Sequence, residues 1–280
     1  MTAGTAFGAR LAAVLDESGP LCVGIDPHGA LLGEWGLTDD AAGVREFGVR
    51  VVDAVAGRAG IVKPQVAFFE RHGAAGYAAL EEVLAAARAA GLLTIADGKR
   101  GDIGSTVDAA GEAWLAPGSP LEADALTAVA YQGLGSLDPV LARAQAAGKG
   151  VFVLAATSNP EGLETQRAVR GDGVSVAAGI VAEVARLNAG SDRLGSVGVV
   201  IGATVDLGDF GIDPDGLSRT PILVPGFGYQ GARIEQAPEL FPGLAQNVIV
   251  SVSRSILQAG PDGIAAAIAE ASREAAAWRE

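Results

Sequence analysis

Residues 76–97 read GYAALEEVLAAARAAGLLTIAD, and this stretch holds one complete unit of the repeat that determines the fold. Its first part, residues 76–90, is rich in Ala, Leu and Glu, which favour a helix. Gly91 interrupts this pattern, and residues 92–97 then form an apolar run of strand length that ends in Asp97. The stretch therefore predicts a helix leading into a buried strand with a carboxylate at its carboxyl end.

The same unit recurs along the chain. Apolar, β-branched runs predict strands at 21–26, 61–66, 92–97, 125–130, 151–156, 197–203, 221–225 and 248–253, with helices between them, for example at 38–56, 76–90, 136–147, 174–188 and 264–278. Strands without polar alternation indicate a sheet that is buried on both faces. Eight such units fit a single (β/α)8 TIM barrel, which we expect to span residues 1–280 as one domain. Residues 5–18 predict a short N-terminal helix that closes the bottom of the barrel, and the polar segment 159–172 is long enough to be a lid.

The composition excludes several classes of protein. The 280 residues carry a net charge of −13, with no cluster of Lys or Arg, which argues against binding to nucleic acid. No apolar run is long enough to span a bilayer, and the start of the chain lacks the features of a signal peptide. The single cysteine, Cys22, lies inside a predicted strand and suits the core and a reducing compartment. We therefore expect a cytoplasmic protein that does not bind membranes.

Charged residues gather where the predicted strands end, at the face on which TIM barrels carry their chemistry. Residues 97–103, DGKRGDI, place Lys99 between Asp97 and Asp102, and Asp26 and Lys63 should converge on them from the first two strands. A lysine flanked by carboxylates keeps its proton, so Lys99 is predicted to act as an acid. The alternative interpretation is a surface ion-pair cluster of little energetic value.

A second group of residues predicts a phosphate site. Pro225 and the glycines after it follow the seventh strand, Gln230 can donate an amide hydrogen, and Arg254 after the eighth strand can hold phosphate oxygens. The loops after these two strands form the usual phosphate site of the fold. An ordinary glycine-rich turn is the competing interpretation. His28 and His72 lack a metal-ligand partner at helical spacing, so no metal site is expected.

The motifs resemble those of the orotidine 5′-phosphate decarboxylase family over essentially the whole chain. The resemblance rests on CVGIDPH at 22–28, VKPQ at 62–65 with FFE at 68–70, DGKRGDI at 97–103, TSNP at 157–160, VPGFGYQG at 224–231 and SRSI at 253–256. The chain length and the VKPQ and TSNP forms are similar to the longer bacterial subgroup. Gly98 stands where the family often has alanine, and Ser253 stands where glycine often precedes the arginine.

The resemblance implies a role for each catalytic residue. Lys99 would protonate C6 of the pyrimidine, and Asp97 would lie beside the departing carboxylate. Lys63 would complete an alternating row of charges. Asp102 and Thr106 would reach the site of a neighbouring subunit, which implies a homodimer with shared active sites.

The resemblance also implies how the substrate is bound. Asp26 and Lys63 would hold ribose hydroxyls, Ser158 would contact the base, and Gln230 and Arg254 would bind the phosphate. The expected reaction is the decarboxylation of orotidine 5′-phosphate to UMP in pyrimidine biosynthesis, without a cofactor. Three alternatives remain: a Mg²⁺-dependent sugar-phosphate decarboxylase of the same superfamily, a lyase that uses Lys99 or Lys63 as a Schiff-base amine, and a barrel that binds a nucleotide or phosphate without turnover.

Overall fold

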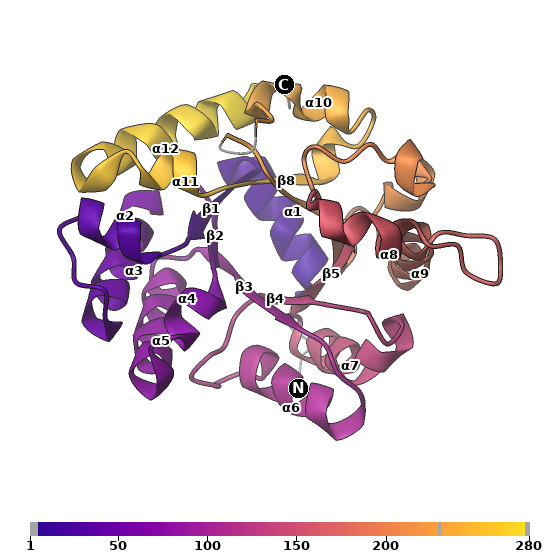
Figure 1. The fold of residues 1–280 in the computed structure, drawn as a ribbon, viewed down its shortest axis with the longest axis horizontal. Helices are drawn as coiled ribbons and strands as arrows, with labels where there is room; N and C mark the ends of the chain where they lie inside the picture. The colour runs from indigo at the N-terminus through magenta and orange to yellow at the C-terminus, as the bar shows by residue number, and fades with distance from the viewer. Residues whose placement is uncertain (1–4, 229–230, 278–280) are drawn as a thin grey trace.

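Eight parallel strands form a closed barrel in the computed structural model, which describes residues 5–228 and 231–277 (Figure 1). Each strand pairs with its neighbours in chain order, and β1 closes the barrel against β8. The predicted (β/α)8 barrel is therefore confirmed. The strands are β1 (Leu21–Ile25), β2 (Ile61–Pro64), β3 (Leu93–Arg100), β4 (Ala125–Ala128), β5 (Gly150–Ala156), β6 (Val197–Ile201), β7 (Ile222–Pro225) and β8 (Val248–Val252).

Helices precede β1 and follow every strand. The α-helices are α1 (Phe7–Ser18), α2 (Gly29–Glu34), α3 (Ala41–Val55), α4 (Val66–Glu70), α5 (Gly73–Ala89), α6 (Gly104–Leu115), α7 (Asp138–Ala147), α8 (Leu163–Arg167), α9 (Val176–Asn188), α10 (Ala237–Leu240), α11 (Arg254–Leu257) and α12 (Gly260–Ala276). Short 3₁₀ helices are η1 (Leu134–Leu137), η2 (Pro160–Gly162), η3 (Gly208–Phe210), η4 (Pro214–Leu217), η5 (Ile234–Gln236) and η6 (Ala245–Asn247). Within the described ranges, none of these helices has both the length and the apolar character that crossing a membrane requires.

Most elements begin or end one to three residues from the predicted bounds, and three of the differences have a clear local cause. Strand β2 ends at Pro64 rather than at residue 66, because helix α4 begins at Val66. Strand β3 continues past Asp97 to Arg100 through an irregularity in its pairing with β4. Helix α12 begins at Gly260, four residues before the predicted start, since a proline is compatible with the first turn of a helix.

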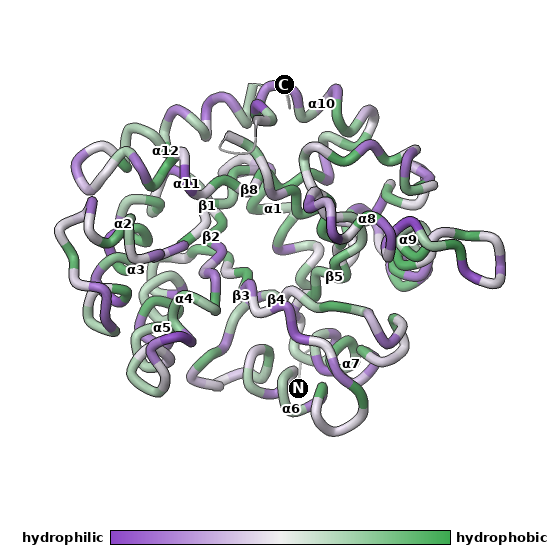
Figure 2. The backbone as a smooth tube through the Cα atoms, in the orientation of Figure 1, coloured by the Kyte–Doolittle hydropathy of each residue, from purple (hydrophilic) through white to green (hydrophobic). Residues whose placement is uncertain are grey.

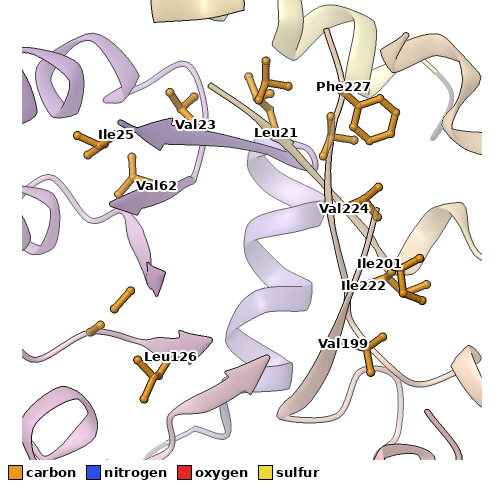
Figure 3. Close-up of a cluster of buried hydrophobic side chains, with 14 of the residues drawn as sticks. Leu21, Val23, Ile25, Val62, Leu126, Val199, Ile201, Ile222, Val224 and Phe227 are labelled. Atoms are coloured by element: carbon orange, nitrogen blue, oxygen red, sulfur yellow. The ribbon is translucent and has the colours of Figure 1, made fainter. Parts of the chain in front are cut away.

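The larger hydrophobic core lies between the barrel and the surrounding helices. Val23 of β1, Val62 of β2 and Val199 of β6 are buried completely and face away from the barrel interior. Figure 3 shows these side chains around the barrel, pointing away from α1 at its centre. This outer core holds the strands in register and so fixes where their carboxyl ends meet.

A second hydrophobic cluster fills the lower barrel, where α1 packs across the amino ends of the strands. Phe7 is fully buried and meets Phe152 of β5 edge to face, with ring centroids 6.0 Å apart. Arg10 of the same helix donates to Asp124, directly before β4, at 2.6 Å. The prediction that the N-terminal helix closes the bottom of the barrel is confirmed. The opposite end is left open, and Figure 2 shows hydrophilic stretches near β2 and β3 among the green of the strands.

Candidate active site

The carboxyl ends of the strands surround a cavity of about 350 Å³. Its charged lining comes from the ends of β1, β2, β3 and β8 and consists of Asp26, Lys63, Asp97, Lys99 and Arg254. The facing wall comes from β5, β6 and β7 and consists of Leu154, Val200 and Leu223. A cavity with one charged and one apolar wall suits a ligand that has a flat apolar ring and ionic substituents.

Asp97 is the centre of a row of three charges. Its Oδ2 atom accepts a hydrogen bond from Nζ of Lys63 at 2.8 Å, and its Oδ1 atom accepts one from Nζ of Lys99 at 2.8 Å. Lys63 and Asp97 are only 5% and 8% exposed, whereas the side chain of Lys99 is 45% exposed. The inner pair is therefore fixed within the barrel, and Lys99 is the most exposed member of the row.

The row keeps its inner members ionised. Burial alone would raise the pKa of Asp97, but the ammonium groups of Lys63 and Lys99 outweigh it and hold this pKa well below its ordinary value. Burial would likewise lower the pKa of Lys63, but the carboxylates of Asp97 and Asp26 outweigh it and raise this pKa above its ordinary value. Burial raises the pKa of the Cys22 thiol to about 12, so it stays protonated at neutral pH, as its predicted place in the core implies.

Gln65 and Thr127 complete the hydrogen bonding of Asp97, and neither was among the predicted site residues. With its amide oriented to satisfy both ends, Gln65 donates to Oδ2 of Asp97 at 2.7 Å and accepts from Nζ of Lys99 at 3.1 Å. Thr127 Oγ1 donates to Oδ1 of Asp97 at 2.9 Å. Residues two positions apart on a strand face the same side of the sheet, and this rule could have identified both. Gln65 lies two positions after Lys63, and Thr127 lies two positions after the inward-facing Ala125.

Asp26 brings a second carboxylate to the cavity, as predicted. Its Oδ1 atom is buried and has no hydrogen-bond partner among the described residues. A buried carboxylate oxygen needs a donor, which a ligand hydroxyl in this cavity can supply. Among the residues that the structure describes, no three His, Cys, Asp or Glu side chains gather as potential metal ligands.

The residues predicted to bind phosphate and described by the structure lie at the carboxyl ends of β7 and β8. Pro225, Gly226 and Arg254 line it, and Arg254 is the first residue of helix α11. Gly226 and Gly228 have φ angles of 116° and 78°, a conformation that glycine adopts without strain. This side of the cavity therefore combines an accessible backbone with a guanidinium group. Gln230 lies outside the described residues.

Three of the predicted residues do not line the cavity of their own chain. Asp102 accepts a hydrogen bond from the backbone N–H of Ile103 at 2.8 Å, and Thr106 is exposed in the first turn of α6. Ser158 is exposed, and its neighbour Thr157 lines the cavity instead. Of the two carboxylates that flank Lys99 in the sequence, the structure thus brings Asp97 and not Asp102 to its ammonium, and the predicted roles of Asp102, Thr106 and Ser158 stay predictions.

The polar segment 159–172 folds into η2 and α8 beside the cavity. Gln166 of α8 joins the segment to Thr157 before it, because its Oε1 accepts from the backbone N–H of Thr157 at 2.9 Å and its Nε2 donates to Oγ1 of Thr157 at 2.7 Å. Arg167 pairs with Asp209 and lies over the ring of Phe210. These contacts connect the segment to the cavity on one side and to the loop after β6 on the other. Its motion as a lid stays a prediction.

Fold and cavity together define a class: a (β/α)8-barrel enzyme with a Lys–Asp–Lys row at the carboxyl ends of its second and third strands and an arginine after its last strand. The chain belongs to the family described as orotidine 5′-phosphate decarboxylase / HUMPS, whose model matches residues 19–269. It is 52% identical to an orotidine 5′-phosphate decarboxylase of Streptomyces coelicolor and 50% identical to one of Salinispora tropica, over 91% and 92% of both chains. The structure is also similar to that of an orotidine monophosphate decarboxylase from Leishmania donovani, with a TM-score of 0.78 and 30% identity over 98% of this chain and 99% of the other.

Proposed function

We propose that this protein decarboxylates orotidine 5′-phosphate to UMP, with Lys99 as the proton donor. One observation supports this assignment above the others: Nζ of Lys99 lies 2.8 Å from Asp97 at the edge of a cavity with an apolar wall, in a family whose relatives carry this activity in their names. The phosphate would bind at Arg254 and the backbone after Pro225, and the ribose hydroxyls at Asp26 and Lys63. Ser158 and Gln230 would contact the base and the phosphate.

The reaction breaks the bond between C6 and its carboxylate, and CO2 leaves. The bonding pair stays on C6 in the plane of the ring, where conjugation does not absorb it. The ammonium of Lys99 stabilises this developing charge and then transfers a proton to C6, after which the neutral amine regains a proton from water. Lys63, Asp97 and Gln65 keep the ammonium in place throughout, so the donor is positioned before the charge develops.

We infer that the active unit is a homodimer with shared sites. Asp102 and Thr106 follow the catalytic strand yet do not line their own cavity. The loops beside them expose large apolar side chains, since Ile103 is 60% exposed and Tyr131 is 82% exposed. A partner subunit that covers these side chains would receive Asp102 and Thr106 near its own Lys99. Residence in the cytoplasm fits the single, buried and unreactive Cys22.

The direct test follows the loss of ultraviolet absorbance of orotidine 5′-phosphate with purified, metal-stripped protein. We expect turnover that a chelator leaves unchanged, whereas a Mg²⁺-dependent decarboxylase would lose its activity. Lys99→Ala should lose turnover by orders of magnitude and keep its circular dichroism spectrum and melting temperature. Borohydride should not trap a substrate adduct on Lys99 or Lys63. A retained rate in Lys99→Ala, or no turnover in the native protein, would overturn the proposal.

A further inference from the structure

Strand β3, which carries Asp97 and Lys99, contains an irregularity in its pairing with β4. This irregularity determines how far along the barrel axis Lys99 lies. Ala96 pairs with Leu126 and Arg100 pairs with Ala128, so the three residues between them on β3 lie opposite Thr127 alone. In a regular ladder Lys99 would lie two residues beyond Thr127, about 6.6 Å further along the strand. The extra residues keep Lys99 at the level of Asp97, within the cavity rather than above it. Such bulges commonly re-aim a side chain beside an active site.

This arrangement has a backbone cost at the catalytic residue itself. Lys99 has a φ angle of 47°, and within the described ranges it is the only residue other than glycine with a positive φ. The left-handed conformation is unfavourable for a residue with a Cβ atom. The conformation persists only if surrounding groups hold it, and a single side chain supplies the principal hydrogen bonds.

That side chain is Thr127, which is 1% exposed. Its Oγ1 accepts a hydrogen bond from the backbone N–H of Lys99 at 2.9 Å and donates one to Oδ1 of Asp97 at 2.9 Å. The same Oδ1 atom accepts from Nζ of Lys99. One hydroxyl therefore connects the strained backbone of Lys99 to the carboxylate that holds its ammonium. Only a group that accepts and donates at one atom can do both.

We propose that Thr127 is a positioning residue for the decarboxylation: its hydroxyl holds the left-handed backbone of Lys99, so that the ammonium stays beside Asp97 and faces the reacting carbon. This inference rests on the proposed function. Valine has the shape of threonine without the hydroxyl, so Thr127→Val leaves the backbone N–H of Lys99 without its acceptor and leaves Oδ1 of Asp97 with the ammonium of Lys99 as its remaining donor. The lysine then relaxes toward a negative φ, and its ammonium leaves the position that the reaction requires.

The chain offers a matched control at the other end of the barrel. Thr94 is 3% exposed, and its Oγ1 accepts from the backbone N–H of Asp124 at 3.0 Å and donates to Oδ2 of Asp124 at 3.2 Å. Thr94 therefore joins a backbone N–H and a carboxylate as Thr127 does, but beside the residues that hold α1. Thr94→Val removes an equivalent pair of hydrogen bonds away from the catalytic row.

The experiment measures kcat and KM for orotidine 5′-phosphate and the melting temperature of Thr127→Val, Thr127→Ser and Thr94→Val. We expect Thr127→Val to lower kcat by about 10- to 100-fold with little change in KM, as the loss of one or two buried hydrogen bonds to a catalytic group implies. Thr127→Ser should stay within about threefold of the native kcat, because it keeps the hydroxyl. Thr94→Val should lower the melting temperature to a similar extent and leave kcat unchanged. Thr127→Ala replaces the valine variant if that variant does not fold.

A second measurement does not depend on catalysis. Hydrogen exchange at the Lys99 amide should be slow in the native protein and in Thr127→Ser, and fast in Thr127→Val. A native protein without decarboxylase activity would contradict the proposed function, and the amide exchange would still test the positioning role. Unchanged kcat together with unchanged exchange in Thr127→Val would overturn the inference, as would an equal loss of kcat in Thr94→Val.

Discussion

The side chains around the cavity are matched to one another residue by residue. Ser253 follows β8, and the space for its hydroxyl comes from Gly24 on the neighbouring strand β1. A Cβ atom at position 24 would lie 1.9 Å from Oγ of Ser253. A side chain at either position therefore excludes one at the other. The same dependence joins Lys63 to Asp97, because a buried ammonium is stable only beside its carboxylate.

Asp97 should make the fold sensitive to acid. Its pKa in the folded protein lies below the ordinary value of 3.8, so between these two values the unfolded chain binds more protons than the folded one. Its contribution to the free energy of unfolding is complete above the ordinary value and is lost as pH falls toward the folded-state value. Lys63 has the opposite sign: its contribution is complete below 10.5 and is lost as pH rises through its raised pKa. Urea denaturation from about pH 2 to about pH 7 measures how the free energy of unfolding falls with acid, which we call the acid limb.

Asp97→Asn is the comparison for this prediction. It should show a smaller loss of stability between about pH 4 and about pH 2, because the titrating carboxylate is gone. At neutral pH it should be about 3–5 kcal/mol less stable than the native protein, since Lys63 then lacks its carboxylate. An acid limb as steep in Asp97→Asn as in the native protein would mean that other groups cause it.

The sequence predicted the charged residues of the cavity because each lies at or just after the carboxyl end of a predicted apolar strand, and parallel strands in a barrel end at one face. Asp26, Lys63 and Asp97 follow from this rule. The positive φ of Lys99 does not, because nothing in the residue type favours it and only the pairing of β3 with β4 imposes it. Strand alternation places Thr127 in the barrel interior, but its contact with Lys99 was missed because it depends on the bulge opposite it.

Among the elements, α1 is the helix outside the strand–helix repeat that closes the barrel. A barrel of eight strands has an open lower end, and α1 covers it with Phe7, Leu11 and Leu15, all buried. The helix fits because Gly150 of β5 has no side chain: a Cβ atom there would lie 2.4 Å from the ring of Phe7. The stability of the lower barrel is thus coupled to a helix that takes no part in the cavity.

Phe7→Ala should test this separation of stability from catalysis. We expect the free energy of unfolding to fall by about 3–5 kcal/mol, because a large aromatic side chain leaves a cavity in a packed core. The kcat should be unchanged at temperatures where the variant is folded, since Phe7 lies at the opposite end from Lys99. Glu17→Ala, on the exposed side of the same helix, should change stability by less than about 0.5 kcal/mol. A loss below about 1 kcal/mol in Phe7→Ala would show that α1 is only loosely docked.

Helices and strands with a complete apolar pattern were predicted close to their observed ends. Helix α9, for example, begins at Val176 with a Ser175 N-cap, against a predicted start at residue 174. The short elements were not predicted: α2, α4 and α8 have six, five and five residues, too few to show a helical period. Their positions depend on contacts with the loops around the cavity, such as the bonds between Gln166 and Thr157.

At the scale of the whole molecule, the single chain leaves part of its sequence motif without a function. Asp102 and Thr106 belong to the same motif as Lys99, yet they lie outside the cavity that Lys99 borders. A net charge of −13 repels an anionic substrate from most of the surface, so the cavity itself must attract it. Lys63, Lys99 and Arg254 supply positive charge there. The position of Asp102 and Thr106 is explained if two subunits complete each other's sites.

Subunit mixing tests this assembly directly. Lys99→Ala and Asp102→Asn should each be nearly inactive alone, but a dimer with one subunit of each has one site with both native residues, if Asp102 acts in the partner's site. Random reassociation of equal amounts makes about half of the dimers mixed, with one native site in each, so about a quarter of the native activity should return. A mixture of Lys99→Ala with Asp97→Asn is the matched control and should stay inactive, because those two residues serve the cavity of their own chain. Recovery in both mixtures, or in neither, would contradict shared sites, since only an exchange of Asp102 between subunits separates the two outcomes.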